Sequence, residues 1–186
     1  EWVVENCGKI CEENGLYFVG GHPMAGTQYS GIKHARATLF KNAPMVLVPP
    51  VFDDIALLDK IKQLLAPAGF GRFSITTAER HDEMIAFLSQ LTHVIAVVLM
   101  NCNDAEGLEK YTGDSFRDLT RIAKINDRMW SELFLMNKDA LLTEMDRFIE
   151  EFTEFRTYLA CGDGKRMREK MRSSTARRAL FDKVAK

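Results

Sequence analysis

The chain has 186 residues, of which 46% are apolar and 27% charged, as in ordinary soluble globular proteins of one or two domains. Its net charge of −1 gives no general preference for nucleic acids or membranes, so we expect neither as a partner. The longest uninterrupted apolar run, Val94 to Met100, is far too short to span a bilayer. No signal-peptide pattern is present, and we expect a cytoplasmic protein.

The first residues, EWVVENCGKICEENG, are typical of an amphipathic helix that ends at Asn14–Gly15. Because a domain seldom begins inside a helix, we expect a fragment or a missing upstream part. Cys7 and Cys11 lie at helical i,i+4 spacing, but no second Cys or His pair completes a zinc set. We therefore expect no metal site and reduced, buried thiols.

Up to about residue 77, short apolar runs alternate with helical stretches. We expect strands at Leu16–Val19, Met45–Val48 and Phe70–Ile75, and a helix over Asp53–Ala66 with its apolar residues on one face. Strand, helix and strand joined this closely are typical of a parallel α/β unit. The sequence therefore predicts that residues 1–77 form half of a doubly wound parallel sheet.

The pattern then becomes helical. Thr76–Glu79 offers a capping box, and the long helix that follows is apolar on nearly all sides near Val94, so we expect it to be buried on two faces. Further helices should start at Ser115 and Asp127, and a long one should run through Leu159. We predict that residues 78–186 form an all-helical domain.

The last long helix carries apolar residues at alternating spacings of four and three, which is typical of a coiled-coil seam. The seam needs a facing helix from the same chain or from a partner, and its residues are Leu141, Met145, Phe148, Phe152, Phe155 and Leu159. The basic stretch from Lys165 to Lys186 has no interleaved aromatic residues, which favours a solvated helical tail over a nucleic-acid or acidic-partner patch.

His22 is the first candidate for chemistry, because it lies in the segment GGHPMAGTQYSG directly after a predicted strand. Ligands of open parallel sheets bind beyond the carboxyl ends of the strands. Pro23 holds His22 extended, and the glycines, Gly20, Gly21 and Gly26, let the backbone approach a flat ligand. A turn histidine that caps a neighbouring group is the alternative.

His93, Arg121 and Trp130 are candidates on the helices, although each also has a structural explanation. A histidine on an apolar helix is usually a core residue, and Ser89 lies one turn before His93. Arg121 has Asp118 three residues before it, which suits an ion pair, but its apolar neighbours suggest a partly buried guanidinium that could bind a carboxylate. Together the candidates predict a pocket for a small anionic substrate.

The motifs HPMAGTQYSGIKHARATLF, SQLTH and FRDLTRIA…DRMW…N, in this order, resemble the prephenate dehydrogenase family, which includes arogenate and cyclohexadienyl dehydrogenases. The resemblance runs from about Val19 to Asn137. It implies a nucleotide-binding Rossmann domain followed by a helical dimerisation domain, and hence a homodimer. The family's G-x-G-x-x-G turn does not occur in this sequence, so we expect this polypeptide to bind cofactor poorly and to have little activity.

By resemblance, the reaction is oxidative decarboxylation of prephenate to 4-hydroxyphenylpyruvate in tyrosine biosynthesis, with NAD or NADP taking the hydride. His22 matches the catalytic histidine, whose neutral form accepts the hydroxyl proton. The substrate-binding positions by resemblance are Arg121, His93, Ser89, Thr27 and Trp130. Gly21 and Pro23 are the positions expected beside the cofactor.

Two departures from the family pattern are visible. Thr92 stands where many members have proline, and Gln28 stands where some have an acid that pairs with the arginine. Three alternatives remain open: an arogenate dehydrogenase, a non-catalytic helical dimerisation module with a vestigial pocket, and a 3-hydroxy-acid dehydrogenase of the same two-domain plan. Against the last, no lysine occupies a position like that of His93.

Overall fold

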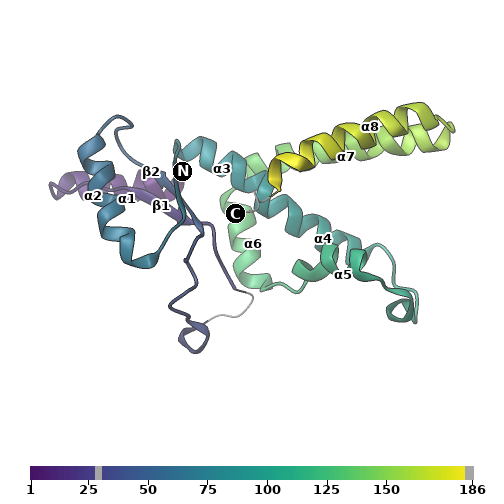
Figure 1. Ribbon diagram of the computed structural model, residues 1–186, viewed down its shortest axis with the longest axis horizontal. Helices are drawn as coiled ribbons and strands as arrows, with labels where there is room; N and C mark the ends of the chain where they lie inside the picture. The colour runs from purple at the N-terminus through teal and green to yellow at the C-terminus, as the bar shows by residue number, and fades with distance from the viewer. Residues whose placement is uncertain (28–30, 183–186) are drawn as a thin grey trace. The chain divides into compact units, whose positions relative to one another are not determined.

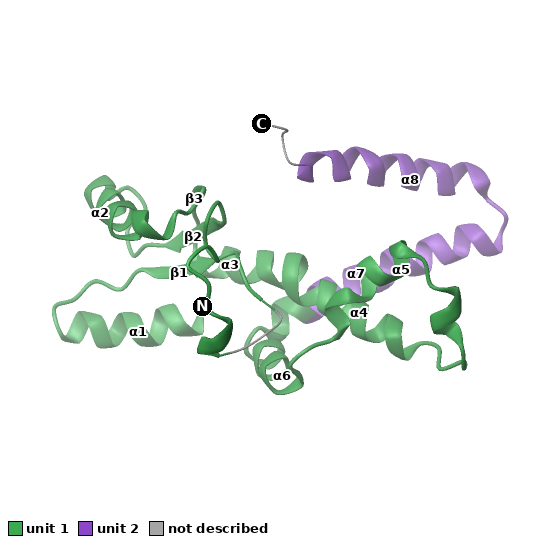
Figure 2. Cartoon of the chain, turned by 60° about the horizontal axis from the view of Figure 1, so that its bottom comes forward, with its two compact units in different colours: residues 1–141 green, residues 142–186 purple. Residues whose placement is uncertain are grey.

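The protein is described here by a computed structural model that covers residues 1–27 and 31–182, so that Gln28 lies outside the described residues. The chain forms two compact units, residues 1–141 and residues 142–186 (Figure 2). The predicted domain boundary after residue 77 falls inside the first unit and stays a prediction.

Unit 1 begins with helix α1 (Figure 1) and contains a sheet whose strands follow the order β1-β2-β3 (Figure 2). The elements of its first half are α1 (Trp2–Glu13), β1 (Gly20–Pro23), η1 (Ile32–His34), β2 (Pro44–Val48), α2 (Ile55–Leu65), η2 (Ala66–Ala68) and β3 (Arg72–Ile75). Strands β2 and β3 are parallel, as expected, whereas β1 runs antiparallel to β2 with His22 opposite Val46. The α/β half-sheet is thus confirmed with one reversed pairing.

The first strand is displaced from its predicted position. Residues Leu16 and Tyr17 are exposed and lie outside any strand, while β1 starts at Gly20. His22 is consequently a strand residue and not the first residue after a strand. The apolar run of residues 16–19 suggested burial, but the hydrogen-bonding register with β2 selects the glycine-containing segment.

Glycine is needed at the start of β1 because other parts of the chain approach its backbone closely. A Cβ at Gly20 would lie 3.0 Å from the Val4 side chain of α1 and 3.2 Å from Val48. A Cβ at Gly21 would lie 2.7 Å from the methyl group of Met45, whereas Gly26 faces open space. At Gly20, packing within the chain therefore explains the glycine without a flat ligand, whereas at Gly21 the contact is only with the flexible end of the Met45 side chain.

The core of the sheet is formed by β2 and α2. Met45, Leu47 and Leu58 are buried, and the residues packed against them are Ile61, Leu65, Phe70 and Phe73. The Asp54 side chain caps α2 by accepting a hydrogen bond from the backbone of Leu57, which satisfies one free N–H at the helix start. Of the four apolar residues on the predicted face of α2, three belong to this core or pack against it: Leu58, Ile61 and Leu65. The fourth, Ile55, is 72% exposed.

A long helix leads from the sheet into the helical region and is composed of three segments. They are α3 (Ala78–Ile85), a π-helical segment η3 (Ala86–Leu91) and α4 (Thr92–Asn101). Thr77 caps α3 by accepting from the backbone of Arg80, one residue later than the predicted capping box. The π-helical segment was not predicted from the apolar stripe, and such segments frequently lie at functional sites.

The long helix is not buried on two faces within this chain, contrary to the prediction. Ala86, Leu91 and Ala96 are buried, but four large apolar side chains are about half exposed: Phe87, Leu88, Val98 and Met100. By length and composition, residues 78–101 could cross a membrane, a test that core helices of soluble proteins also pass. Gln90 and His93 on the same helix contact polar and aromatic groups of the chain, as expected of protein packing.

The remaining helices of unit 1 follow in short steps: η4 (Leu108–Tyr111), α5 (Asp114–Thr120), η5 (Arg121–Ala123) and α6 (Asp127–Met136). Asn126 caps α6 by accepting from the backbone of Met129. Both predicted helix starts, at Ser115 and Asp127, are confirmed to within one residue.

Unit 2 consists of most of α7 (Lys138–Ala160) with α8 (Gly164–Arg178) and η6 (Ala179–Phe181). Lys170 of α8 lies 2.5 Å from the carboxylates of both Glu151 and Glu154 on α7, and these contacts raise the pKa of Lys170. Within the described residues, the predicted seam is only partly covered, because Phe152 and Leu159 remain 65% and 63% exposed.

Candidate functional site

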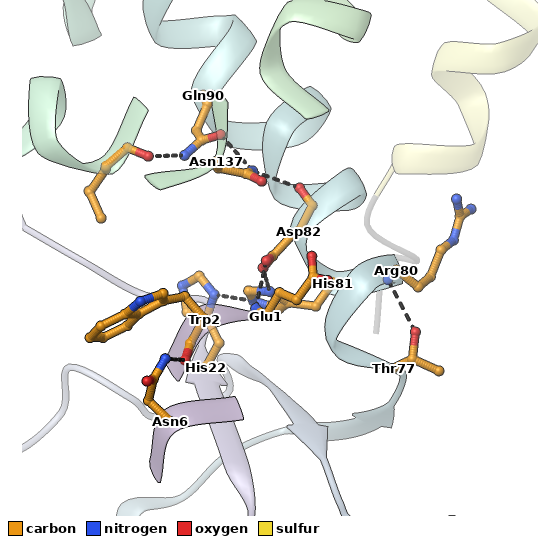
Figure 3. Close-up of polar contacts among 11 residues, drawn as sticks. Glu1, Trp2, Asn6, His22, Thr77, Arg80, His81, Asp82, Gln90 and Asn137 are labelled. Atoms are coloured by element: carbon orange, nitrogen blue, oxygen red, sulfur yellow. Dashed lines mark hydrogen bonds and ion pairs between the residues drawn. The ribbon is translucent and has the colours of Figure 1, made fainter. Parts of the chain in front are cut away.

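His22 makes its main side-chain contact with a residue that the sequence analysis did not single out. Its Nδ1 lies 2.7 Å from Nε2 of His81 on α3, and the two rings are tilted, with centroids 5.0 Å apart (Figure 3). Both rings are partly buried. A strand of the sheet and the first turn of the long helix therefore meet through two imidazoles.

Asp82 contacts the other ring nitrogen of His81. Its Oδ1 lies 2.7 Å from Nδ1 of His81, and the two side chains are 24% and 19% exposed. Its Oδ2 lies 2.6 Å from the α-ammonium group of Glu1. The described residues thus connect a carboxylate and two imidazoles through successive contacts, Asp82–His81–His22.

The environment favours the neutral form of His22. Burial lowers the pKa of His22 below its ordinary value of 6.5, the neighbouring His81 lowers it further, and Asp82 acts in the opposite direction. A neutral imidazole can accept a proton, whereas an imidazolium cannot. The site therefore keeps His22 available as a base at neutral pH.

A buried amide network holds the end of α6 against the same helix. Gln90, which is 4% exposed, donates from Nε2 to the carbonyl of Leu133 and accepts at Oε1 from Nδ2 of Asn137. Asn137 also donates to the carbonyl of Asp82. Asn137, the last residue of the quoted motifs, thus ties α6 to the helix that carries His81 and Asp82.

His93 belongs to a second cluster farther along the helix. Its ring stacks on Trp130 of α6, with centroids 3.8 Å apart and planes 29° apart. Its Nδ1 lies 2.8 Å from the backbone oxygen of Ser89, so the Ser89 hydroxyl is not its partner. Because a carbonyl only accepts, Nδ1 of His93 carries a proton and, in the neutral ring, Nε2 is left as an acceptor.

Thr92, noted in the sequence analysis as a departure from the resembled pattern, is the first residue of α4. The Thr92 hydroxyl donates to the backbone oxygen of Ser89 over 2.7 Å, the same oxygen that His93 contacts. The helix continues through Thr92, and His93 lies on α4.

Arg121 opens η5, which packs against α4, and its side chain is exposed rather than partly buried as predicted. The predicted alternative, an ion pair with Asp118, is not formed. Arg121 makes no hydrogen bond or ion pair with any residue that the structure describes, whereas the nearby Arg117 contacts Asp114 and the carbonyl of Thr112. The Arg121 guanidinium is consequently available for an anion.

The positions expected beside a cofactor lie on β1. Gly21 is exposed and Pro23 is partly buried, on either side of His22. Thr27 is exposed. Among the described residues no three His, Cys, Asp or Glu side chains gather as metal ligands, and the thiols of Cys102 and Cys161 are exposed, contrary to the expectation of burial.

The two histidine clusters are separated along one helix. His81 lies on α3 and His93 on α4, with the π-helical segment η3 between them. The structure therefore brings His22 together with His81, and His93 together with Trp130, at different points of the same long helix. Sequence reasoning missed His81, Asp82 and Gln90, since their only local signal is a polar pair and an amide on an otherwise apolar stripe.

Comparison with known proteins places this geometry in context. Residues 2–73 match the nucleotide-binding domain of prephenate dehydrogenase, and residues 77–173 match its dimerization domain. The chain is 34% identical over 155 residues to a prephenate dehydrogenase of Bacillus subtilis, covering 81% of this chain and 42% of that protein. It is 36% identical over 171 residues to a cyclohexadienyl dehydrogenase of Zymomonas mobilis, covering 87% and 57%.

Solved structures give the same result. The arogenate dehydrogenase of Synechocystis superposes with a TM-score of 0.76 at 25% identity, covering 89% of this chain and 62% of that one. The prephenate dehydrogenase of A. aeolicus, in complex with hydroxyphenyl propionate and NAD+, superposes with a TM-score of 0.76 at 28% identity, covering 89% and 59%. The chain spans about half the length of the two curated relatives. With both domain matches in chain order and the predicted fold class confirmed, this chain belongs to the prephenate dehydrogenase family.

Proposed function

We propose that the protein to which this chain belongs is an NAD- or NADP-dependent prephenate dehydrogenase, which converts prephenate to 4-hydroxyphenylpyruvate and carbon dioxide in tyrosine biosynthesis. The observation that carries the proposal is the partly buried His22, which contacts His81 and through it Asp82, and whose pKa is lowered by burial. The match to both domains of the family supports it.

In this proposal His22 is the catalytic base. Its ring accepts the proton of the substrate's ring hydroxyl, so that an O–H bond breaks and an N–H bond forms. The electron pair left on oxygen helps to expel hydride from the ring carbon that carries this oxygen. Loss of carbon dioxide then makes the ring aromatic. General bases of this kind contribute roughly 10²–10⁴-fold to the rate.

Arg121 and His93 anchor the anionic end of the substrate. An exposed guanidinium without an ion-pair partner among the described residues can form two parallel charge-assisted hydrogen bonds with a carboxylate. His93 offers its Nε2 from α4, the helix against which η5 packs, with the stacked Trp130 as an apolar wall. We assign Ser89 and Thr27 to weaker polar contacts with the substrate.

The cofactor accepts the hydride when it is bound. Gly21 and Pro23 flank His22 on β1, and we propose that they adjoin the nicotinamide end. The sequence contains no G-x-G-x-x-G turn, so the pyrophosphate-binding residues are not among those described, and the described residues fit only this end of the cofactor.

We further propose that the protein is a homodimer through its helical region. The half-exposed apolar side chains of the long helix and of α7, such as Phe87, Val98 and Phe152, would be covered by a second copy. Light scattering at micromolar concentration should give twice the monomer mass, and a monomer would contradict this part of the proposal. The cytoplasmic location expected from the sequence stays a prediction.

The test uses this chain fused behind a family G-x-G-x-x-G segment, named here the extended chain. We expect prephenate-dependent reduction of NAD or NADP by the extended chain, and a loss of about 10²–10⁴-fold in kcat for His22→Asn. His34→Asn, at an exposed position, is the matched control. Unchanged turnover of the His22 variant would exclude His22 as the base, and turnover of arogenate alone would assign the alternative substrate.

A further inference from the structure

Asp82 restricts the protonation of His81. An oxygen of Asp82 lies 2.7 Å from Nδ1 of His81. When the carboxylate is ionised, this oxygen can accept a hydrogen bond but cannot donate one. Nδ1 of His81 must therefore carry a proton, and in the neutral ring Nε2 then has none. The Nε2 atom of His81 is left as an acceptor that faces His22.

The acceptor on His81 in turn determines which nitrogen of His22 carries the proton. Because its Nδ1 lies 2.7 Å from the acceptor Nε2 of His81, Nδ1 of His22 must be the donor. The proton of neutral His22 then resides on Nδ1, and its lone pair resides on Nε2. This nitrogen is the one that remains for a substrate hydroxyl.

We propose that His81 and Asp82 are positioning residues that fix the tautomer of His22, so that Nε2 of His22 is the basic atom. The inference rests on the proposed function and names two residues that act through the catalytic base. When Nε2 of His22 takes the substrate proton, the ring becomes an imidazolium whose Nδ1–H still donates to His81. Asp82 offsets the new positive charge through His81.

Spectroscopy tests this inference without any turnover, on the 186-residue chain itself. Long-range proton–nitrogen correlation spectra distinguish protonated from unprotonated ring nitrogens. We expect His22 to be protonated at Nδ1 and unprotonated at Nε2 near neutral pH. His93, whose Nδ1 faces the carbonyl of Ser89, is an internal reference for this pattern. Protonation of His22 at Nε2 in the unsubstituted chain would overturn the inference.

Two substitutions sharpen the measurement. Asp82→Asn presents His81 with an amide that can donate, as in the serine-protease triad, where the same change selects the wrong tautomer without altering the geometry. We expect the protons of both rings to move to Nε2. His81→Phe keeps a ring but removes the acceptor, so His22 should give a mixture of tautomers. His81→Gln offers an amide oxygen to His22 and should restore part of the Nδ1-protonated form.

Kinetics of the extended chain provide a second readout, and the N-terminal extension also replaces the α-ammonium group of Glu1 by a peptide group. We expect Asp82→Asn to lower kcat by at least about tenfold, with KM for prephenate changed less than about threefold. A purely structural role would change KM and stability together and would leave the tautomer unchanged. If His22 has the expected tautomer but the extended chain has no turnover, the proposed function fails and the tautomer assignment stands.

Discussion

The ring of His93 lies flat against Trp130, with centroids 3.8 Å apart, and this contact joins α4 to α6 beside the proposed anchor for the substrate. Stacked aromatic pairs contribute about 0.5–1.5 kcal/mol beyond the area they bury. The stack also fixes the orientation of the imidazole, whose Nδ1 is held by the Ser89 carbonyl. Removal of the stacked Trp130 ring should therefore affect both the stability of the fold and the binding of substrate.

Trp130→Ala should lower the free energy of unfolding by about 2 kcal/mol, less than the ~3–5 kcal/mol of a Trp→Ala change at a buried core site, because Trp130 is only partly buried. Trp130→Phe retains a ring and should lose about half as much. Urea denaturation measures the difference. Equal losses for the two variants would show that the ring stack contributes nothing.

Arg121→Ala should weaken prephenate binding by about 10–100-fold, because a charge-assisted hydrogen bond contributes roughly 1.5–3 kcal/mol. The extended chain should show this as a rise in KM that grows smaller as salt screens the exposed guanidinium. Arg128→Ala removes an exposed arginine that pairs with Glu132 and is the control. An unchanged KM for Arg121→Ala would exclude this residue as the anchor.

The acid limb of kcat/KM should lie below pH 6.5. Burial and, after it, the neighbouring His81 hold the pKa of His22 below its ordinary value, whereas Asp82 acts in the opposite direction. His81→Gln should move the limb upward because it removes the group that lowers the pKa. Asp82→Asn should move the limb downward, and movement of both variants in one direction would contradict this account.

The lowered pKa of His22 also has a consequence for stability. Around pH 6.5 the unfolded chain binds more protons at this position than the folded chain, so stability rises with pH there. The contribution of His22 to folding is complete above pH 6.5 and declines as the pH falls toward the folded-state pKa. Thermal unfolding of the chain and of His22→Asn across this range should show a smaller decline in the variant.

Asn137→Ala should lower the free energy of unfolding by about 1–3 kcal/mol, because it leaves the buried Oε1 of Gln90 without a donor. Asn101→Ala, at an exposed helix end, should change it by less than about 0.5 kcal/mol. A double-mutant cycle with Gln90→Leu isolates the amide pair. Strictly additive losses in that cycle would show that the two side chains do not interact.

The helices and the family could be read from the sequence because their signals are local. Apolar spacing and capping residues predict α2, the long helix and α7 to within a few residues, since a helix joins residues that are three and four apart. The motif around His22 led to the proposal that this histidine is the base. The same local signals placed the first strand too early, because strand register depends on a partner more than twenty residues away.

Only the tertiary structure revealed the contacts that join His22 to His81 and His81 to Asp82, and the buried amide pair of Gln90 and Asn137. His22 and His81 lie far apart in the chain, and their contact arises because α3 packs against β2, the neighbour of β1 in the sheet. The sequence by itself determined which residue types were available and on which helical faces they lie. Packing decided which of them meet, because hydrogen bonds between distant residues depend on the path of the chain and leave no periodic pattern in the sequence.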